Sequence, residues 1–306
     1  MSYHIVNIDS PRCSISCKQG QLTCVSEDGR RQQAPLEDVA AIVITSFSAQ
    51  LHSHLLMEAA KHGVALVICE RFQPVSLLLP ANRSTDTLLT KAALTLEKKK
   101  VATLWRKTID AKCANQASLA EHLNPNHAKL ETLRKRANSK APGKESTCAR
   151  YYWGIYADAL TLTDFKRSRD AGGANDLLNF GYAILLSLIL QKLFACGLDP
   201  TLGISHEVRE RSTPLAYDLM EPFRPCVDWR VARWITEEAA PDDYRVDGRF
   251  RRYVTDFTLE RIGYLGIEMD FRNCLESVVR SFRQAVLSGQ TRHYKPWTPS
   301  NSKWAG

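Results

Sequence analysis

The first eighty residues alternate apolar and polar side chains with the two-residue period of β-strands. Turn-forming residues separate these runs, and Gln19-Gly20 and Asp28-Gly29 suit tight hairpin connections. Residues 48–62 instead have the apolar spacing of a helix, and Gly63 suits the position just after its end. The predicted strands are Tyr3–Ile8, Cys13–Cys17, Leu22–Ser26, Val39–Ile44, Val64–Cys69 and Val75–Leu79.

From Asp86 onward the apolar period changes to 3.6 residues, which is typical of helices. Residues 80–85 are rich in turn formers and mark a boundary. We therefore predict a two-domain α+β protein: a small β-sandwich or β-roll with one helix (1–82), and a larger all-α catalytic domain (83–306) with a flexible tail (295–306). The predicted helices are Asp86–Lys112, His127–Asn138, Lys144–Thr163, Asn175–Cys196, one starting at Pro214, Trp229–Glu238, Phe250–Leu259 and Asp270–Ser288.

Several classes of protein are disfavoured. The longest apolar run, Tyr182 to Leu190, is too short to span a bilayer and predicts a buried helix. The first residues lack a basic region followed by an apolar run, so we expect no secretory signal. The nine cysteines form no CxxC pair and are odd in number, which favours reduced thiols. We therefore predict a cytoplasmic protein without membrane attachment.

The most informative stretch for chemistry runs from His206 to Asp228. A histidine lies in an arginine-rich loop, and Thr213-Pro214 is a good helix start, since Thr caps a helix and Pro suits its first position. In the helix that follows, Asp218 and Glu221 are three residues apart and share a face. One imidazole and two carboxylates form a candidate site for a hard cation. The motif HExxH is absent, which argues against a zinc protease.

A further acidic ligand is needed from another helix, and Glu145 is the best candidate. It lies in the first turn of a predicted helix, directly after the Pro142-Gly143 break. An acid in a first turn is also favoured by the helix dipole alone, so the position by itself does not demand a metal.

Four motifs together resemble a known family: ESTCARYYW (145–153), NDLLNFGYAILLSLI (175–189), GISH (203–206) and PLAYDLMEPFRPCVD (214–228). In order, spacing and chemistry they are similar to the CRISPR-associated integrases of spacer acquisition, the larger subunit of the CRISPR adaptation complex. The resemblance covers essentially the whole chain, and it is strongest to versions that accompany single-effector systems.

The resemblance implies a role for each acid. In the family a glutamate, a histidine and a second acid bind a divalent ion, and these positions match Glu145, His206 and Glu221, with Asp218 as an accompanying acid. Cys148 replaces an alanine of the family motif without affecting the ligands. Pro222 departs more visibly, because it removes a backbone donor and is expected to kink the helix beside the site.

Carboxylates with one imidazole suit Mg²⁺ or Mn²⁺ better than zinc. The resemblance implies a DNA transesterification that inserts a short foreign fragment into the CRISPR array, together with the reverse disintegration reaction and nicking of DNA by water. His206 remains open between ligand and proton shuttle. Two alternatives also remain open: a metal-dependent endonuclease for branched DNA that does not integrate, and a non-catalytic DNA-binding scaffold.

The net charge of +8 favours a polyanionic partner, although charge alone is weak evidence. Basic residues that flank the proposed ligands are candidate phosphate contacts, and others form broader patches, about half of which we expect to be ordinary solvated helix faces. No base-reading motif is evident, so recognition would rest on DNA shape and partners. The candidate DNA-binding residues are Lys144, Arg209, Arg211, Arg224, Arg167 and Arg134.

The expected partners follow from the resemblance. They are double-stranded DNA (the incoming fragment and the leader–repeat junction), a second copy of the chain joined through the β domain, and a small ferredoxin-like adaptation subunit, which would complete a heterohexamer. An exposed strand edge in a small β domain suits such dimerisation.

Overall fold

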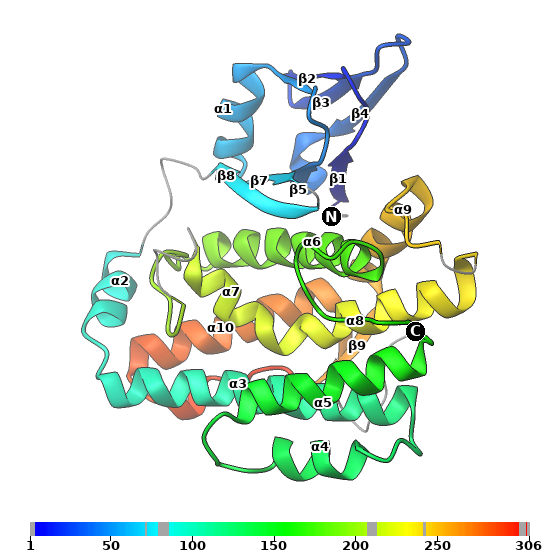
Figure 1. The fold of residues 1–306 in the computed structure, drawn as a ribbon. Coiled ribbons are helices and arrows are strands. Elements are labelled where there is room, and N and C mark those ends of the chain that lie inside the picture. Colours follow the sequence, from blue (N-terminus) through cyan, green and yellow to red (C-terminus); the bar gives the residue numbers. More distant parts are fainter. Residues whose placement is uncertain are drawn as a thin grey trace.

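The computed structural model describes residues 4–70, 72–78, 86–206, 213–240, 243–299 and 304. Within these ranges, strands and one helix build the part before residue 79, and helices dominate the part after residue 86 (Figure 1). This arrangement confirms the predicted α+β fold class. The predicted domain boundary at residue 82 lies outside the described residues.

The N-terminal strands form two sheets. In the first, of order β1-β5-β7-β8, the strands β1, β5 and β7 run parallel and β8 is antiparallel to β7. The second has the order β4-β3-β2-β6. The bounds are β1 His4–Ile8, β2 Ser14–Lys18, β3 Gln21–Val25, β4 Arg31–Pro35, β5 Val39–Ile44, β6 Gln50–Leu51, β7 Ala65–Glu70 and β8 Gln73–Leu78. The sequence pattern missed β4 and β6, because β4 (RQQAP) has no apolar alternation and β6 has two residues.

The first sheet is covered on both faces, which explains the nearly continuous apolar runs of its central strands. Ile42 and Leu66 face the second sheet and the helix α1 (Ser53–Lys61). Val43 and Val67, the next residues along, join the core of the helical part. There the sheet contacts α6 (Ala174–Ala195) through β5, β7 and β8. The strands therefore pack directly on the helices (Figure 1).

The helical part is built around α6, the most buried helix. Among the described residues, α6 is the one helix long and apolar enough to cross a membrane, and 89% of its apolar window is buried inside the protein. The prediction of a buried helix is therefore confirmed. The other helices are α2 Thr87–Leu94, α3 Lys98–Leu123, α4 Leu130–Ala137, α5 Lys144–Ala159, α7 Pro214–Met220, α8 Arg224–Arg233, α9 Gly248–Asp256 and α10 Phe271–Ser288.

The predicted single helix Asp86–Lys112 is wrong. The structure breaks it at residues 95–97, where the backbone of Glu97 is extended (φ −56°, ψ 135°). No glycine or proline signals this break. Its cause is tertiary, because α2 packs against α10 while α3 packs against α5 and the turn after α7.

A second correction concerns the expected all-α character of residues 83–306. A hairpin of β9 (Arg261–Tyr264) and β10 (Ile267–Asp270) lies between α9 and α10. Its connection is Leu265-Gly266, and both residues have positive φ (50° and 82°), as a two-residue hairpin turn requires.

All nine cysteines are free thiols and eight of them are buried. This agrees with the expected reduced thiols. Burial raises the pKa of the Cys69 thiol to about 12, so this cysteine is a poor nucleophile at neutral pH.

The described part of residues 295–306 is packed against the core, which differs from the flexible tail that we expected. Trp297 is 1% exposed, and its ring stacks on Phe223 with 5.7 Å between the centroids. Its Nε1 donates to the carbonyl of Gly263 at 3.0 Å. Trp304 contacts Trp297 edge-to-face and is also buried.

If the tail is part of the core, Trp297→Ala should lower the free energy of unfolding by about 3–5 kcal/mol, the usual cost of truncating a buried aromatic side chain. Urea unfolding followed by circular dichroism measures this. The matched control is Thr298→Ala, one residue further along and exposed, which should change stability by less than about 0.5 kcal/mol. Equal stability of parent and Trp297→Ala would contradict the packing.

A candidate metal centre between three helices

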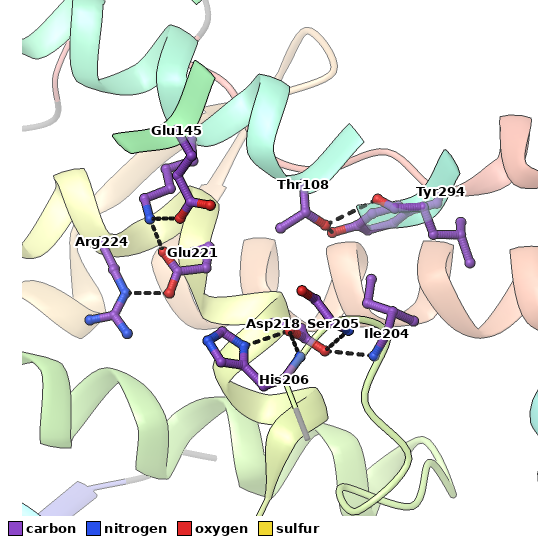
Figure 2. A network of polar contacts seen from close by, with 11 residues as sticks. Thr108, Glu145, Ile204, Ser205, His206, Asp218, Glu221, Arg224 and Tyr294 are labelled. Carbon is purple, nitrogen blue, oxygen red and sulfur yellow. Dashed lines mark hydrogen bonds and ion pairs between the residues drawn. The ribbon is translucent and has the colours of Figure 1, made fainter. Parts of the chain in front are cut away.

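The loop that carries His206 is held by one buried carboxylate. Asp218, in α7, accepts backbone N–H groups from Ile204 (2.6 Å), Ser205 (3.1 Å) and His206 (3.2 Å), and it also bonds Nδ1 of the His206 ring at 2.7 Å (Figure 2). The loop passes so close to α7 that a Cβ on Gly203 would lie 2.7 Å from Pro214 Cβ. Asp218 therefore fixes the position of His206 and orients its ring so that Nδ1 faces the carboxylate.

Glu221 lies where α7 ends. Glu221 is the first residue of a 3₁₀ turn, Glu221–Phe223, and α8 begins directly after it at Arg224. Pro222 interrupts the α-helical hydrogen bonding here, as predicted, and its carbonyl accepts from Asn115 Nδ2 of α3 at 2.7 Å. The turn aims the Glu221 carboxylate into the interior, where the side chain is only 6% exposed.

Glu145 reaches the same place from α5. It lies in the first turn of that helix, after Gly143, whose φ is 64°. The ammonium of Lys112, in α3, lies 2.6 Å from Glu145 Oε1 and 2.6 Å from Glu221 Oε2. Arg224 Nε donates to the other oxygen of Glu221 at 2.8 Å (Figure 2). Two acids from separate helices thus converge on one cation.

The surrounding charges and hydrogen bonds shift the pKa values of Glu221 and His206. Burial alone would raise the pKa of Glu221, but Arg224 and Lys112 outweigh it and lower that pKa to about 2. The hydrogen bond that the His206 ring donates to the Asp218 carboxylate raises the pKa of His206, against the effect of burial. Glu221 is therefore ionised at neutral pH, and His206 keeps its proton to higher pH than a free histidine.

A second buried carboxylate, Asp228 of α8, ties three helices together behind the site. Its Oδ2 accepts from Tyr152 of α5 (2.7 Å), its Oδ1 accepts from Tyr182 of α6 (2.5 Å), and its carbonyl accepts from Tyr156 (3.0 Å). The guanidinium of Arg224 stacks on the Tyr182 ring, 4.6 Å from its centroid. This network fixes the arginine that holds Glu221.

Close packing of the backbone makes the network possible. A Cβ at Gly181 would lie 2.4 Å from Val227 Cγ1, so only glycine permits this approach of α6 to α8. Thr108 and Tyr294 add a further tie, with their hydroxyls 3.0 Å apart between α3 and the segment after α10 (Figure 2).

The donor set suits a hard cation, although no three His, Cys, Asp or Glu side chains within the described ranges lie close enough to form a metal site by themselves. Glu145 and Glu221 already share a cation, the Lys112 ammonium. Glu221 Oε2 is buried and accepts no hydrogen bond of good geometry. A carboxylate on Nδ1, as on His206, is the usual support of a metal-ligating histidine. Glu145, Glu221 and His206 are therefore the residues that could hold such an ion, supported by Asp218.

The residues predicted to contact DNA differ in their position and in their partners. Arg224 lies at the site, where it pairs with Glu221. Arg167 lines a pocket together with Arg224, and it donates to the amide oxygens of Asn175 and Asn179 at 2.9 and 2.8 Å. Lys144 instead donates to Asp110 at 2.6 Å. Arg134, on α4, pairs with Glu121 and Glu131. Arg209 and Arg211 lie outside the described residues.

Sequence reasoning missed Lys112, Asn115 and Asp228. A signal for the first two existed, because Lys112 and Asn115 lie three residues apart near the apolar stripe of α3, where a charged side chain needs a partner. Asp228 gave no comparable signal, since its partners come from helices that are distant in sequence.

A family model described as "CRISPR associated protein Cas1" matches residues 6–261. The chain belongs to the Cas1 family.

A Cas1 relative from Neisseria meningitidis, named "CRISPR-associated endonuclease Cas1", is 30% identical over 221 residues, which cover 71% of each chain. Among solved structures, a casposase bound to integration product has the same fold, with a TM-score of 0.75, 22% identity and coverage of 98% and 96%. A Cas6-RT-Cas1–Cas2 complex matches with a TM-score of 0.74 at 16% identity, covering 97% of this chain and 36% of that one. These names state no CRISPR subtype, so the resemblance to single-effector versions stays a prediction.

The Asp228 network predicts a specific pH dependence. Burial raises the pKa of Asp228 to about 6, although the two tyrosine hydroxyls oppose this. The folded protein therefore binds this proton more tightly than the unfolded chain, and the contribution of Asp228 to stability falls as pH rises from about 4 through about 6. Asp228→Asn should remove this loss, so that the variant gains up to about 3 kcal/mol relative to the parent between pH 4 and 7.

Urea unfolding of both proteins at intervals from pH 4 to 7 measures the difference. Tyr182→Phe is the comparison variant, since it keeps the carboxyl but removes a hydrogen bond that lowers the pKa of Asp228, and it should therefore extend the loss of stability to higher pH. A difference between Asp228→Asn and parent that does not vary with pH would rule the assignment out.

Proposed function

We propose that this Cas1 protein is a divalent-metal-dependent DNA integrase of CRISPR adaptation. The reaction is a transesterification that inserts short foreign fragments into the CRISPR array, together with its reversal and the nicking of DNA. The observation that carries the proposal is the convergence of Glu145 and Glu221 on one cation position, beside a histidine held by Asp218. The casposase of the same fold, described as bound to integration product, supports joining over cleavage alone.

In this reaction a 3′-hydroxyl attacks a phosphodiester, one P–O bond forms while another breaks, and the leaving 3′-oxygen takes up a proton. Mg²⁺ or Mn²⁺, held by Glu145, Glu221 and His206, would supply charge neutralisation at the phosphate and acidify the attacking hydroxyl. Asp218 orients the imidazole, so that Nε2 is the nitrogen left for a ligand bond or for proton transfer. Arg224 is held at the site, where its guanidinium suits a phosphate oxygen.

Hydrolysis is the second candidate activity, favoured by the name of the Neisseria relative, an endonuclease. The same residues serve it if water takes the place of the hydroxyl. A labelled fragment incubated with a supercoiled repeat plasmid and Mg²⁺ or Mn²⁺ separates the possibilities: joined product supports integration, cleavage alone supports the nuclease, and binding without either supports a scaffold.

The partners proposed are double-stranded DNA, a second copy of the chain and Cas2 as the small ferredoxin-like subunit, in a heterohexamer. The Cas6-RT-Cas1–Cas2 complex supports the last of these. Dimerisation through the N-terminal β domain is supported by three large apolar side chains exposed in that domain, Phe47 (84%), Val75 (58%) and Met57 (54%). We also propose a cytoplasmic location, which membership of the Cas1 family supports.

Glu221→Ala and His206→Ala should each lower the rate of joining by roughly a hundredfold or more, because each removes a proposed ligand. DNA affinity, measured in parallel by fluorescence anisotropy, should change little. The control is Glu276→Ala, which also removes a glutamate in ion pairs, with Lys192 and Arg280, away from the site. Joining by Glu221→Ala at the parental rate would show that the site is wrong.

Arg167 and Arg134 have different partners, so they should contribute differently to DNA binding. Arg167 bonds neutral groups and keeps its charge for phosphate, whereas two glutamates offset that of Arg134. Arg167→Gln should reduce the slope of log K against log salt by about one, and Arg134→Gln should leave it nearly unchanged. Anisotropy titrations from 50 to 200 mM salt test this, and equal slopes for parent and Arg167→Gln would refute the contact.

A further inference from the structure

We infer that Lys112 is an internal counter-ion of the Cas1 site: it holds Glu145 and Glu221 together without a divalent ion, and must leave when that ion binds. It thereby lowers the affinity of the site for the metal. This inference rests on the proposed function, because it concerns the same two glutamates.

The position of Lys112 is set by three elements. Its stem rises from α3, which contacts both α5, the helix of Glu145, and the 3₁₀ turn of Glu221. The ammonium lies 2.6 Å from an oxygen of each glutamate, and the lysine side chain is 13% exposed. Glu145 accepts a hydrogen bond from the ammonium, and Glu221 forms an ion pair with it. A lysine so enclosed is placed by its charge partners and not by packing alone.

The local charges balance without a metal. Glu145 and Glu221 carry two negative charges, and Lys112 and Arg224 carry two positive ones. Without Lys112, two carboxylates would face each other at close range, one of them almost fully buried, and would repel. With a divalent ion added and both bases still in place, the same small volume would hold an excess of two positive charges. One of the two positively charged side chains, Lys112 or Arg224, therefore has to move.

Arg224 is the positively charged side chain that stays in the site. Its guanidinium stacks on the Tyr182 ring, and the Tyr182 hydroxyl is bonded to buried Asp228. It also holds the Glu221 oxygen that Lys112 does not contact. Lys112, by contrast, has a flexible four-carbon stem and a compact ammonium, so it can withdraw without disturbing the helices. The metal thus competes with Lys112 for the same two oxygens. Only protein in which the lysine has left the site can bind the metal, so the apparent metal affinity is reduced in proportion to that fraction.

The test is a Mn²⁺ titration of the full chain, followed by calorimetry and by the loss of the free-ion electron paramagnetic resonance signal. Lys112→Met keeps the length of the stem and removes the charge, and it should bind Mn²⁺ at least tenfold more tightly than the parent, about 1.4 kcal/mol. The matched control is Lys192→Met. Lys192 pairs with Glu276 at 3.1 Å, and its side chain is 12% exposed, but it lies away from the site. Its Mn²⁺ affinity should equal that of the parent.

A second readout does not depend on the binding constant. In metal-free buffer Lys112→Met should melt at a lower temperature than the parent, because the glutamates lose their counter-ion, and saturating Mn²⁺ should raise its melting temperature by more than it raises that of the parent. If Lys112→Met does not fold without metal, Lys112→Gln, which is neutral but can still donate a hydrogen bond, takes its place in both measurements.

The outcomes separate the two claims. Mn²⁺ binding that is lost in Glu221→Ala but unchanged or weaker in Lys112→Met would overturn the counter-ion role alone. A parent that binds no Mn²⁺, or Glu221→Ala binding like the parent, would overturn the metal site and the role of Lys112 with it. Tighter binding in Lys112→Met, with no change in Lys192→Met, supports both.

Discussion

Two glutamates from separate helices that meet at one ammonium, one of them buried, impose the strongest physical constraint on this protein. A buried carboxylate is costly unless it is paired, and Glu221 is almost completely enclosed. Lys112 and Arg224 supply that pairing from α3 and α8. The geometry of α3, α5 and the α7–α8 turn must therefore be right for all four side chains at once, and the surrounding core serves that arrangement.

Two buried aspartates outside the proposed ligand set, Asp228 and Asp218, hold the residues of the site in place. Asp228 collects hydroxyls from two tyrosines on two other helices, and through the Tyr182 ring it holds Arg224. Asp218 does the same for the His206 loop through backbone N–H groups. Asp218 thus positions His206, and Asp228 positions Glu221 indirectly through Tyr182 and Arg224, and neither aspartate itself needs to touch metal or DNA. Such support is what keeps catalytic groups within the narrow tolerance that phosphoryl chemistry demands.

Much of this could be predicted from the chain. Period and turn chemistry located β2, β3, α5, α6 and α10 closely, because each is a local pattern that its own residues satisfy. The spacing of Asp218 and Glu221 after Thr213-Pro214 put both acids on one helical turn, and Pro222 marked where that helix ends. Glu145 entered only as a candidate, and the family resemblance was needed to join it to the other two.

What the sequence determined by itself is therefore local: which segments coil, where α7 begins and ends, and which side chains carry charge. The tertiary structure decided the break between α2 and α3, the burial of Trp297 and the partners of Lys112 and Asp228. The physical reason is that these features depend on contacts between residues tens of positions apart. The acid that Lys112 meets is decided by how α3 packs against α5 and α8, and no periodicity within α3 records it.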